Sequence, residues 1–383
     1  MSLLFCSENC CLISHEEFIN RIYNESISND GGTETKYKIN PDLFDLNVPY
    51  RYKAEDSQTK KRQRKIIDKT KQQIEEQHRH EYELIERIKL RTNEFLNECR
   101  KRKLLNSTSD DGTKLTNEQM KLCLDQWQTV ECSYTKQFNG KNNFDRPVIC
   151  EFNGEKHIIP ANCSFSNADI QHIELKSNDY DLIVMDPPWW NKYIRRSRKF
   201  NTENGYQMLN NESIADIPIE MAIQPNRTLV AVWCTNAPSN IQAVQQTFLP
   251  KWKLKLLATW FWIKVTKYGE TICEFDLPLK KQPFERIFIA CHEDSSYNFN
   301  SIPDEKLIYS VPSAIHSNKP PLQDLFIPYM RGSDCDISSL EIFARYLLPN
   351  CTSIGLEVLK LQHLQLFNAE NAKDVHELHA VKE

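Results

Sequence analysis

The sequence is poor in glycine and lacks the patterns that identify several common classes of protein. Its 383 residues include nine glycines and no GxGxxG turn, the turn with which dinucleotide and S-adenosylmethionine domains usually open. No apolar run is long enough to cross a bilayer, and residues 1–5 are too short for a signal peptide. We expect a soluble, intracellular protein without a membrane partner, whose ligands are held by side chains and non-glycine backbone.

Charge and cysteine content exclude two further classes. The net charge of −4 means that any binding of nucleic acid must come from local basic patches. The 13 cysteines are odd in number, scattered and without paired CxxC spacing, which favours a reducing compartment over a disulfide framework. The cluster Cys6, Cys10, Cys11 and His15 has only one cysteine pair with usable spacing. We therefore predict no metal site.

Composition divides the chain into four parts. Residues 1–52 hold short apolar patches and a flexible linker at 29–33, and residues 53–150 form a charged helical region. Within that region we predict a long helix, or two, over 53–103 with one narrow apolar stripe, and another helix over 117–128. The basic run 60–65 is equally consistent with nuclear import or phosphate contact and with a solvated helical face. Residues 151–368 form the main domain and 369–383 a tail.

Strand-like and helical patterns alternate from about residue 148 onward, which is typical of an α/β sheet domain. We predict helices over 239–248 and 321–330. Ligands of such sheets bind beyond the carboxyl ends of the strands. The predicted strands cover 180–185, 228–234, 254–263, 286–291, 307–311, 340–344 and 353–356.

The most informative motif follows the first of these strands. Asp186, Pro187, Pro188 and Trp189 end a buried-strand pattern. The Asp186 carboxylate and the Pro187 carbonyl can each accept one N–H of an amino group, and the two prolines fix the backbone that presents these acceptors. Trp189 could form a flat wall for an unstacked base. The alternative is an ordinary turn followed by a core tryptophan.

A basic loop follows the motif and predicts contact with nucleic acid. Its arginine and lysine side chains would neutralise phosphates without recognising a base sequence. The alternative is a solvated loop. Further along, Trp262 and Lys264 lie on an aromatic strand that could stack a base, although core packing is the alternative for its rings. The candidate substrate residues of the loop are Asn191, Lys192, Arg195, Arg196, Arg198 and Lys199.

With this motif in place, the C-terminal half resembles the MT-A70 family of N6-adenine methyltransferases, in its methyltransferase-like protein 4 branch. The tetrapeptide 186–189 matches the family's catalytic motif. Further matches are residues 316–322 (HSNKPPL), 341–345 (EIFAR) and 355–360 (GLEVLK), with a short N-terminal match at 41–45 (PDLFD). The resemblance covers about 158–363 and implies a Rossmann-like methyltransferase sheet in a permuted motif order, with a mainly helical N-terminal region.

The resemblance also implies roles for individual residues. Asp169 and Ile170 would meet the adenine of S-adenosylmethionine, and Lys319 its methionine end. His316 joins the substrate-binding set. The structural alternative makes Phe343 a core residue and Glu341 a salt-bridge partner. The residues implied to line the ribose and neighbouring positions are Glu341, Phe343, Arg345 and Glu357.

Two residues depart from the family pattern. Leu356 stands where an asparagine is expected, and Tyr346 stands where a polar residue follows the arginine. Leucine cannot hydrogen-bond a ribose hydroxyl, and one lost hydrogen bond costs about 1 kcal/mol, roughly fivefold in affinity. We therefore expect weakened cofactor binding.

The activity implied by the resemblance is S-adenosylmethionine-dependent methylation of adenine N6 in RNA. The branch favours internal 2′-O-methyladenosine of U2 small nuclear RNA, giving N6,2′-O-dimethyladenosine, in the nucleus first and the cytoplasm second. The alternatives are a DNA N6-adenine methyltransferase and a noncatalytic RNA-binding subunit. The sequence leaves the oligomeric state open, a monomer among the alternatives.

Overall fold

A computed structural model describes most of the chain. The described residues are 2–25, 27–28, 34–51, 76, 78–106, 115–116, 137–175, 179–189, 209–297, 299, 301–315, 317–330 and 337–371. The predicted linker 29–33, the basic run 60–65, the helix over 117–128 and the loop 191–199 lie outside them.

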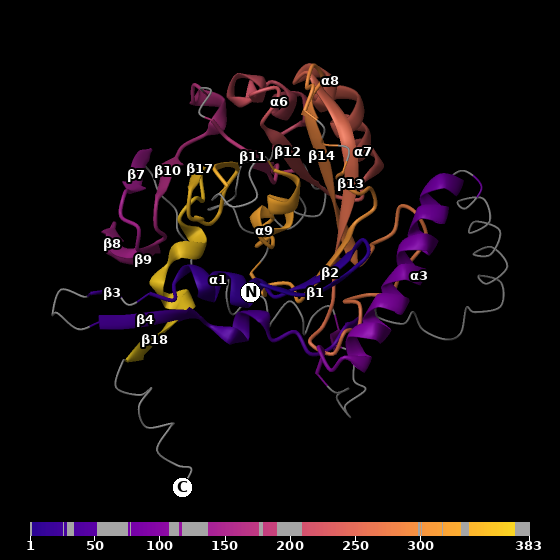
Figure 1. Ribbon diagram of the computed structural model, residues 1–383, viewed down its shortest axis with the longest axis horizontal. Coiled ribbons are helices and arrows are strands. Elements are labelled where there is room, and N and C mark those ends of the chain that lie inside the picture. The colour runs from indigo at the N-terminus through magenta and orange to yellow at the C-terminus, as the bar shows by residue number, and fades with distance from the viewer. Residues whose placement is uncertain are drawn as a thin grey trace, which may run out of the picture.

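An 11-stranded sheet forms the centre of the molecule (Figure 1), in the order β1-β2-β15-β13-β14-β12-β11-β16-β17-β10-β7. Its strands are rich in Val, Ile, Leu and Trp, and most are buried on both faces, as expected for a sheet covered by helices. In sequence order they are β1 (Leu3–Ser7), β2 (Cys10–Ile13), β7 (Phe138–Asn142), β10 (Cys163–Asn167), β11 (Leu182–Met185), β12 (Leu229–Cys234), β13 (Leu254–Lys264), β14 (Phe284–His292), β15 (Leu307–Ser310), β16 (Ser339–Ile342) and β17 (Cys351–Ile354).

The strand order confirms the predicted α/β class and its permutation. β10, β17, β16, β11 and β12 run parallel to one another, as do β13, β15 and β2, while β14 runs antiparallel between β12 and β13. β16 and β17 come late in the chain, yet they lie between β10 and β11. The strand that leads to Asp186 therefore precedes β16 and β17 in sequence, although these two strands separate it from the earlier strand β10 in the sheet.

Helices cover the two faces of the sheet unequally (Figure 1). On one face α6 (Asn211–Ala215), α7 (Pro238–Ala243), a π-helical turn (Val244–Phe248) and α8 (Leu249–Lys251) pack on β11 and β12. The same face is covered at β2, β13 and β15 by α3 (Arg79–Lys101). On the opposite face lie α9 (Gln323–Phe326) and a 3-10 turn (Ile327–Tyr329). Alternate residues of each strand point to opposite faces of the sheet and pack in the core on that face.

The predicted charged helix is α3 in its described part. Its apolar side, including Leu84, Ile88, Phe95 and Leu96, is buried against the sheet. The stripe predicted from sequence therefore packs on this chain itself. No helix in the described ranges combines the length and apolar character needed to span a bilayer.

The described N-terminal residues carry strands that sequence reasoning missed. β1 and β2 extend the central sheet, while β3 (Ile27–Ser28) and β4 (Glu34–Ile39) join β18 (Phe367–Asn371) from the other end of the chain. α1 (His15–Ile22) and a 3-10 turn (Pro41–Phe44) connect these pieces. Two small two-stranded sheets complete the fold: β5 (Tyr50–Arg51) with β6 (Leu115–Thr116), and β8 (Val148–Phe152) with β9 (Glu155–Ile159).

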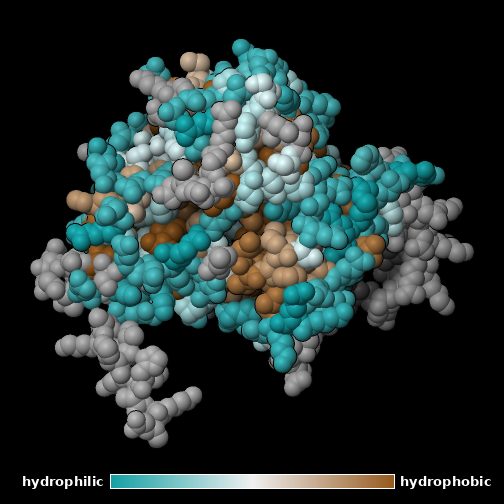
Figure 2. All heavy atoms as spheres, viewed as in Figure 1, coloured by the Kyte–Doolittle hydropathy of each residue, from teal (hydrophilic) through white to brown (hydrophobic). Residues whose placement is uncertain are grey.

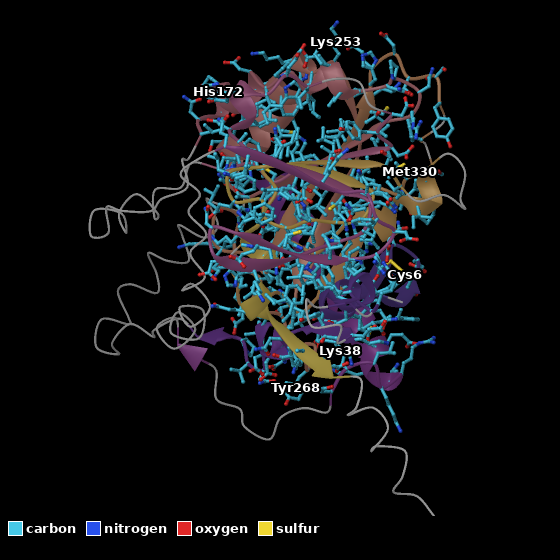
Figure 3. All side chains as sticks on the ribbon, turned by 90° about the vertical axis from the view of Figure 1, so that its left-hand side faces the viewer. Cys6, Lys38, His172, Lys253, Tyr268 and Met330 are labelled. Carbon is cyan, nitrogen blue, oxygen red and sulfur yellow. A yellow bond between two sulfur atoms is a disulfide. The ribbon has the colours of Figure 1, made fainter. Side chains whose placement is uncertain are left out.

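One disulfide joins β1 to β2, between Cys6 and Cys11 (Figure 3). It departs from the expectation of unpaired cysteines, because register in a hairpin places these two residues directly opposite each other. Eight other described cysteines form no disulfide. The described residues hold no group of three or more ligating side chains arranged for a metal.

The remaining short elements and the strand limits refine the sequence predictions. Strand 180–185 begins two residues later, at Leu182, and strand 254–263 extends to Lys264. The predicted helix 239–248 is divided between α7 and the π-helical turn. The strand β10, which precedes Asp169, was missed. Short 3-10 turns occur at Ile170–His172, Ile219–Ala222, Lys360–Gln362 and Leu364–Leu366.

Candidate active site

Charged side chains gather where the parallel strands of the sheet end. Asp186 follows β11 directly, and Arg345 and Glu357 follow β16 and β17. Glu285 belongs to the same edge, because β14 runs antiparallel and begins where its neighbour β12 ends. Lys319 reaches the edge on the loop after β15. The carboxyl edge of an open α/β sheet is the usual place for a ligand.

Asp186 is buried, and its two carboxylate oxygens have different surroundings. Oδ2 accepts hydrogen bonds from Arg345 Nη1 at 2.9 Å and from Ser317 Oγ at 3.1 Å. Oδ1 accepts no hydrogen bond from the described residues, and the Lys319 ammonium lies 3.9 Å from it. One oxygen is therefore fixed by two donors while the other remains an available acceptor.

The two prolines hold a second acceptor next to Asp186. The Pro187 carbonyl accepts the Trp189 N–H at 2.8 Å, and the Pro188 carbonyl accepts the Leu209 N–H at 3.3 Å. A carbonyl oxygen has two lone pairs, so Pro187 keeps one for a ligand.

Trp189 is 9 % exposed and is held as a core residue would be. Its ring stacks on Phe248 with a centroid distance of 5.9 Å and an interplanar angle of 5°. Its indole N–H donates to the Trp233 carbonyl at 3.3 Å. One face of the ring is thus already used, and the predicted wall for a base can only be the other face.

Glu285 is a functional candidate that sequence reasoning missed. Its carboxylate pairs with both Lys264 and Lys319. The two lysines hold the pKa of Glu285 well below its usual range although burial opposes them. Burial would lower the pKa of Lys319, but the carboxylates of Asp186 and Glu285 outweigh it and raise that pKa. An acidic residue within an otherwise apolar strand pattern was the available signal.

Three carboxylates and four cations form one network of alternating charge. Arg345 bridges Asp186 and Glu357, with a distance of 3.1 Å from its Nε to Glu357 Oε2. Lys360 closes the network on Glu357 Oε1 at 2.7 Å. Burial raises the pKa of Glu357, yet Lys360 and Arg345 outweigh it and lower that pKa. Arg345 and Glu357, both predicted for the cofactor, are thus in direct contact.

Glu341 lies on β16 beneath this network and is 6 % exposed. Burial, reinforced by the nearby Asp186 carboxylate, raises the pKa of Glu341 to about 8. The nearby Tyr346 hydroxyl opposes this rise in pKa, and Oε2 has no hydrogen-bond partner among the described residues. At neutral pH this side chain is therefore mostly a neutral acid with one oxygen available for a hydrogen bond.

The other residues predicted for the cofactor have structural contacts. Asp169 caps a 3-10 turn by accepting the Gln171 N–H at 3.0 Å, and Ile170 packs in the core beside β11. Phe343 is 8 % exposed in the same core and has a left-handed backbone, with φ of 65°. Such a φ is rare for a bulky residue and costs about 1–3 kcal/mol. Their roles toward a cofactor stay predictions.

The sharp turn after β17 brings the next predicted residues close to β16. A Cβ on Gly355 would lie 2.5 Å from the Ala344 carbonyl oxygen, so only glycine fits there. Leu356, the residue after it, is 40 % exposed. Its apolar side chain therefore faces the surroundings where a polar group was expected.

The substrate side is described only in part. Trp262 is 2 % exposed and donates its indole N–H to Ser310 Oγ at 2.8 Å, so it packs in the core. The Lys264 ammonium lies 4.7 Å from the Trp262 ring centroid and is paired with Glu285. His316 and the basic loop 191–199 lie outside the described residues, and their substrate roles stay predictions.

Comparison with known proteins agrees with this geometry. The MT-A70 family model matches residues 180–357, the stretch that contains Asp186, Lys319, Arg345 and Glu357. Over 240 residues the chain is 36 % identical to the human protein named N(6)-adenine-specific methyltransferase METTL4, covering 60 % of this chain and 48 % of that protein.

Two further relatives differ in the nucleic acid that their names give. A Caenorhabditis elegans protein named DNA N6-methyl methyltransferase is 34 % identical over 58 % of this chain and 59 % of its own length. A Cryphonectria parasitica protein named N6-methyladenosine RNA methyltransferase MTA1 is 36 % identical over 48 % of this chain and 53 % of its own length. The chain spans about half the length of these curated relatives. The fold and the charged strand edge agree with the similarity of residues 180–357 to the MT-A70 family model.

Proposed function

We propose that this protein is an S-adenosylmethionine-dependent methyltransferase acting on N6 of adenine in RNA. The observation that carries the proposal is the asymmetry of Asp186: Oδ2 is held by Arg345 and Ser317, while Oδ1 accepts no hydrogen bond from the described residues. An exocyclic amine needs an acceptor for its N–H, because its lone pair is otherwise delocalised into the ring and is a poor nucleophile.

The chain's own groups can orient such an amine. Asp186 Oδ1 accepts one N–H, and the second lone pair of the Pro187 carbonyl accepts the other. The positions of both acceptors are fixed before substrate arrives, Asp186 by Arg345 and Ser317 and Pro187 by its ring. Asp186 Oδ1 is also the atom placed to take the proton that the methylated amine loses. Positioning therefore supplies most of the rate enhancement.

The residues of the edge fit S-adenosylmethionine, which when bound supplies a methyl group activated on a sulfonium. Lys319 would offer a buried cation for its carboxylate, Asp186 would offer a carboxylate for its positive charge, and Glu341 would offer a carboxyl group for a hydrogen bond. Glu341 Oε2 is a buried oxygen without a partner in the described residues, as expected for an atom that waits for a ligand donor. Leu356 removes one ribose hydrogen bond, so we expect affinity roughly fivefold lower than with asparagine there.

The choice of RNA rests on the resemblance to the methyltransferase-like protein 4 branch and on the relative named an RNA methyltransferase. We favour internal 2′-O-methyladenosine of U2 small nuclear RNA, giving N6,2′-O-dimethyladenosine, and hence a nuclear protein. A DNA substrate is the second candidate, since one relative is named a DNA N6-methyl methyltransferase. The five cationic side chains of residues 191–199 suit either phosphate backbone.

The test is methyl transfer to three matched oligonucleotides: RNA with adenosine, RNA with 2′-O-methyladenosine, and single-stranded DNA. We expect the highest kcat/KM on the 2′-O-methylated RNA. A preference for DNA would keep the chemistry and replace the substrate. Absence of transfer to all three by a folded protein that binds no S-adenosylmethionine in calorimetry would favour the noncatalytic RNA-binding subunit.

A further inference from the structure

The loop that brings Ser317 and Lys319 to Asp186 has little structure of its own. It connects β15 to α9 over residues 311–322, and its described residues form neither helix nor strand. Its described internal hydrogen bonds are Ile315 N–H to Ser313 Oγ at 3.2 Å and Asn318 N–H to the Ile315 carbonyl at 3.3 Å. Ser317 has a left-handed backbone, with φ of 63°. Such a conformation persists only where surrounding structure enforces it.

A segment from the other end of the chain supplies that support through its backbone. Residues 40–46 run beside the loop, and the Ala314 N–H donates to the Leu43 carbonyl at 2.6 Å. Three residues later the Leu46 carbonyl accepts the Lys267 N–H at 2.9 Å, and the Asp45 carboxylate pairs with the Lys267 ammonium. The segment is thus bonded to the loops that follow both β15 and β13.

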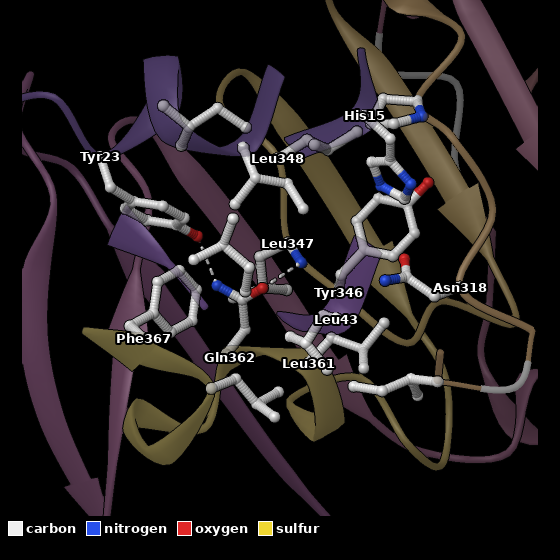
Figure 4. Close-up of a pocket in the computed structure, with 16 residues that line it drawn as sticks. His15, Tyr23, Leu43, Asn318, Tyr346, Leu347, Leu348, Leu361, Gln362 and Phe367 are labelled. Atoms are coloured by element: carbon white, nitrogen blue, oxygen red, sulfur yellow. Dashed lines mark hydrogen bonds between the residues drawn. The ribbon is translucent and has the colours of Figure 1, made fainter. Parts of the chain in front are cut away.

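Side chains of the same segment fill the space behind the loop. Leu43 is 1 % exposed and Phe44 3 %, and both pack in one cluster with Ile315. Figure 4 shows Leu43 and Asn318 lining a common cavity with Tyr346, which follows Arg345 in the sequence. The volume of this cavity is about 30 Å³, so the loop has little room to collapse toward the segment.

The segment is itself anchored at its start. The Asn40 N–H donates to the Leu366 carbonyl at 2.8 Å, and the Asn40 side chain accepts the Asp42 N–H at 3.1 Å. The ring of His15 from α1 meets the edge of Phe44 at 5.1 Å. A support fixed at both ends can transmit a defined position to the loop.

We propose that residues 40–46 are a positioning element of the active site, which holds loop 311–322 so that Ser317 and Lys319 reach Asp186. This inference rests on the proposed function for its catalytic consequence. It assigns a role to an N-terminal segment that lies outside the MT-A70 match at residues 180–357. A catalytic fragment that begins after the segment would lose this support.

The experiment compares Leu43→Ala with Leu96→Ala in the full chain. Both remove the same atoms from buried leucines, since Leu96 is 3 % exposed, but Leu96 lies on α3 in a different core. At a temperature where both variants remain folded, amide hydrogen exchange is measured for loop 311–322, together with kcat at saturating substrates. Asp45→Asn is a third variant, which removes the charge paired with Lys267 and changes the group that accepts from Asn47 Nδ2 at 3.1 Å; both contacts are on the surface, so it carries little risk of unfolding.

We expect loop amides to exchange at least about tenfold faster in Leu43→Ala and within about twofold of wild type in Leu96→Ala. The kcat should fall roughly 10- to 100-fold in the first variant alone, because small displacements of catalytic groups have effects of that size. In Asp45→Asn, loop amide exchange should be faster and kcat lower, each by about two- to threefold. Equal changes in the two leucine variants would overturn the proposal. If wild type transfers no methyl group, the proposed function fails while the exchange comparison still decides this inference.

Discussion

Each end of strand β11 carries an aspartate paired with an arginine, but the two carboxylates differ in the hydrogen bonds that they accept. Asp181 precedes the strand and pairs with Arg227, while Asp186 follows it and pairs with Arg345. Both Asp181 oxygens are occupied: Oδ1 accepts from Arg227 Nε at 2.7 Å, and Oδ2 accepts from Arg227 Nη2 at 3.3 Å and from the Ser338 N–H at 3.0 Å. Asp186 leaves Oδ1 without a hydrogen bond from the described residues. A saturated carboxylate supports the scaffold, and a half-saturated one can bind a ligand.

Two glutamates repeat this contrast between the ends of the sheet. Glu305, just before β15, pairs with Arg87 at 2.6 Å and Arg91 at 3.7 Å, and all three side chains are at least 28 % exposed. Glu285 also pairs with two cations, but Lys319 is only 10 % exposed in its side chain and continues to Asp186. Exposed ion pairs contribute little to the free energy of unfolding, whereas removing one partner of a buried ion pair lowers it strongly.

The largest effect is expected from exchanging the two aspartates for asparagine. Asp186→Asn turns a fixed acceptor into a group that can present a donor to the amine, so turnover should fall at least about 100-fold with the fold intact. Asp181→Asn should lower the melting temperature and leave turnover within about twofold. Methyl transfer and thermal unfolding of both variants make the measurement. More than about a tenth of wild-type turnover in Asp186→Asn would remove Asp186 from the mechanism.

The next effect separates the two glutamates. Glu285→Gln leaves Lys264 and Lys319 without their shared carboxylate, and we expect a loss of about 3 kcal/mol in the free energy of unfolding. Methyl transfer should fall roughly tenfold, mainly through the KM for S-adenosylmethionine, because Lys319 loses its anchor. Steady-state kinetics and urea unfolding would be compared with Glu305→Gln. Equal kinetic effects of the two substitutions would contradict the division between the ends of the sheet.

Glu341 should make stability depend on pH in a defined window. Its folded pKa of about 8 lies above its usual value of 4.5, so only the folded state keeps the proton between these values. The free energy of unfolding then falls as pH rises, by at most about 1.4 kcal/mol per unit. Burial lowers the pKa of His15 to about 3, so His15 makes the free energy of unfolding rise with pH. This rise is nearly complete by pH 7 and does not mask the effect of Glu341.

The measurement is therefore urea unfolding of wild type and Glu341→Gln at pH 7 and pH 8. We expect the wild type to lose about 1 kcal/mol between the two and the variant to lose much less. Parallel behaviour of the two proteins would mean that Glu341 is not protonated in the fold.

The smallest effect is expected on the surface of α3. Arg87→Gln removes an ion pair with side chains 47 % and 28 % exposed. Such a pair contributes 1 kcal/mol or less in typical cases, and less at high salt. Denaturant unfolding should change by roughly that amount, and methyl transfer should match wild type. A substantial kinetic effect would extend the functional region to the opposite end of the sheet.

The sequence predicted those parts of the molecule that depend on local pattern. The buried run before Asp186 predicted a strand. This assignment placed Asp186 at the carboxyl edge of the sheet, where a ligand was expected. The permuted order could be inferred only through family resemblance, because strand neighbours depend on contacts between distant residues. β17 is separated from β10 by more than 100 residues, yet it pairs with β10, and β16 lies between β17 and β11 in the same sheet.

The parts that were missed depend on charge pairing and on short strands. Glu285 carries no motif, and its importance comes from two lysines that the fold brings to it. Ser317 lies in a matched motif, but its contact with Asp186 requires a left-handed backbone that sequence does not reveal. β1 and β2 are only five and four residues long, too short for a periodic signal, so their place in the central sheet was not predicted.

The central claim is that the open oxygen of Asp186 receives the exocyclic amine of adenine. The most direct test is to locate the methyl group that wild type transfers from labelled S-adenosylmethionine to an adenosine-containing oligonucleotide, by nucleoside mass spectrometry against N6-methyl and N1-methyl standards. The account predicts label at N6, abolished in Asp186→Asn and retained in Asp181→Asn. Label at N1, or N6 label that survives in Asp186→Asn, would contradict it.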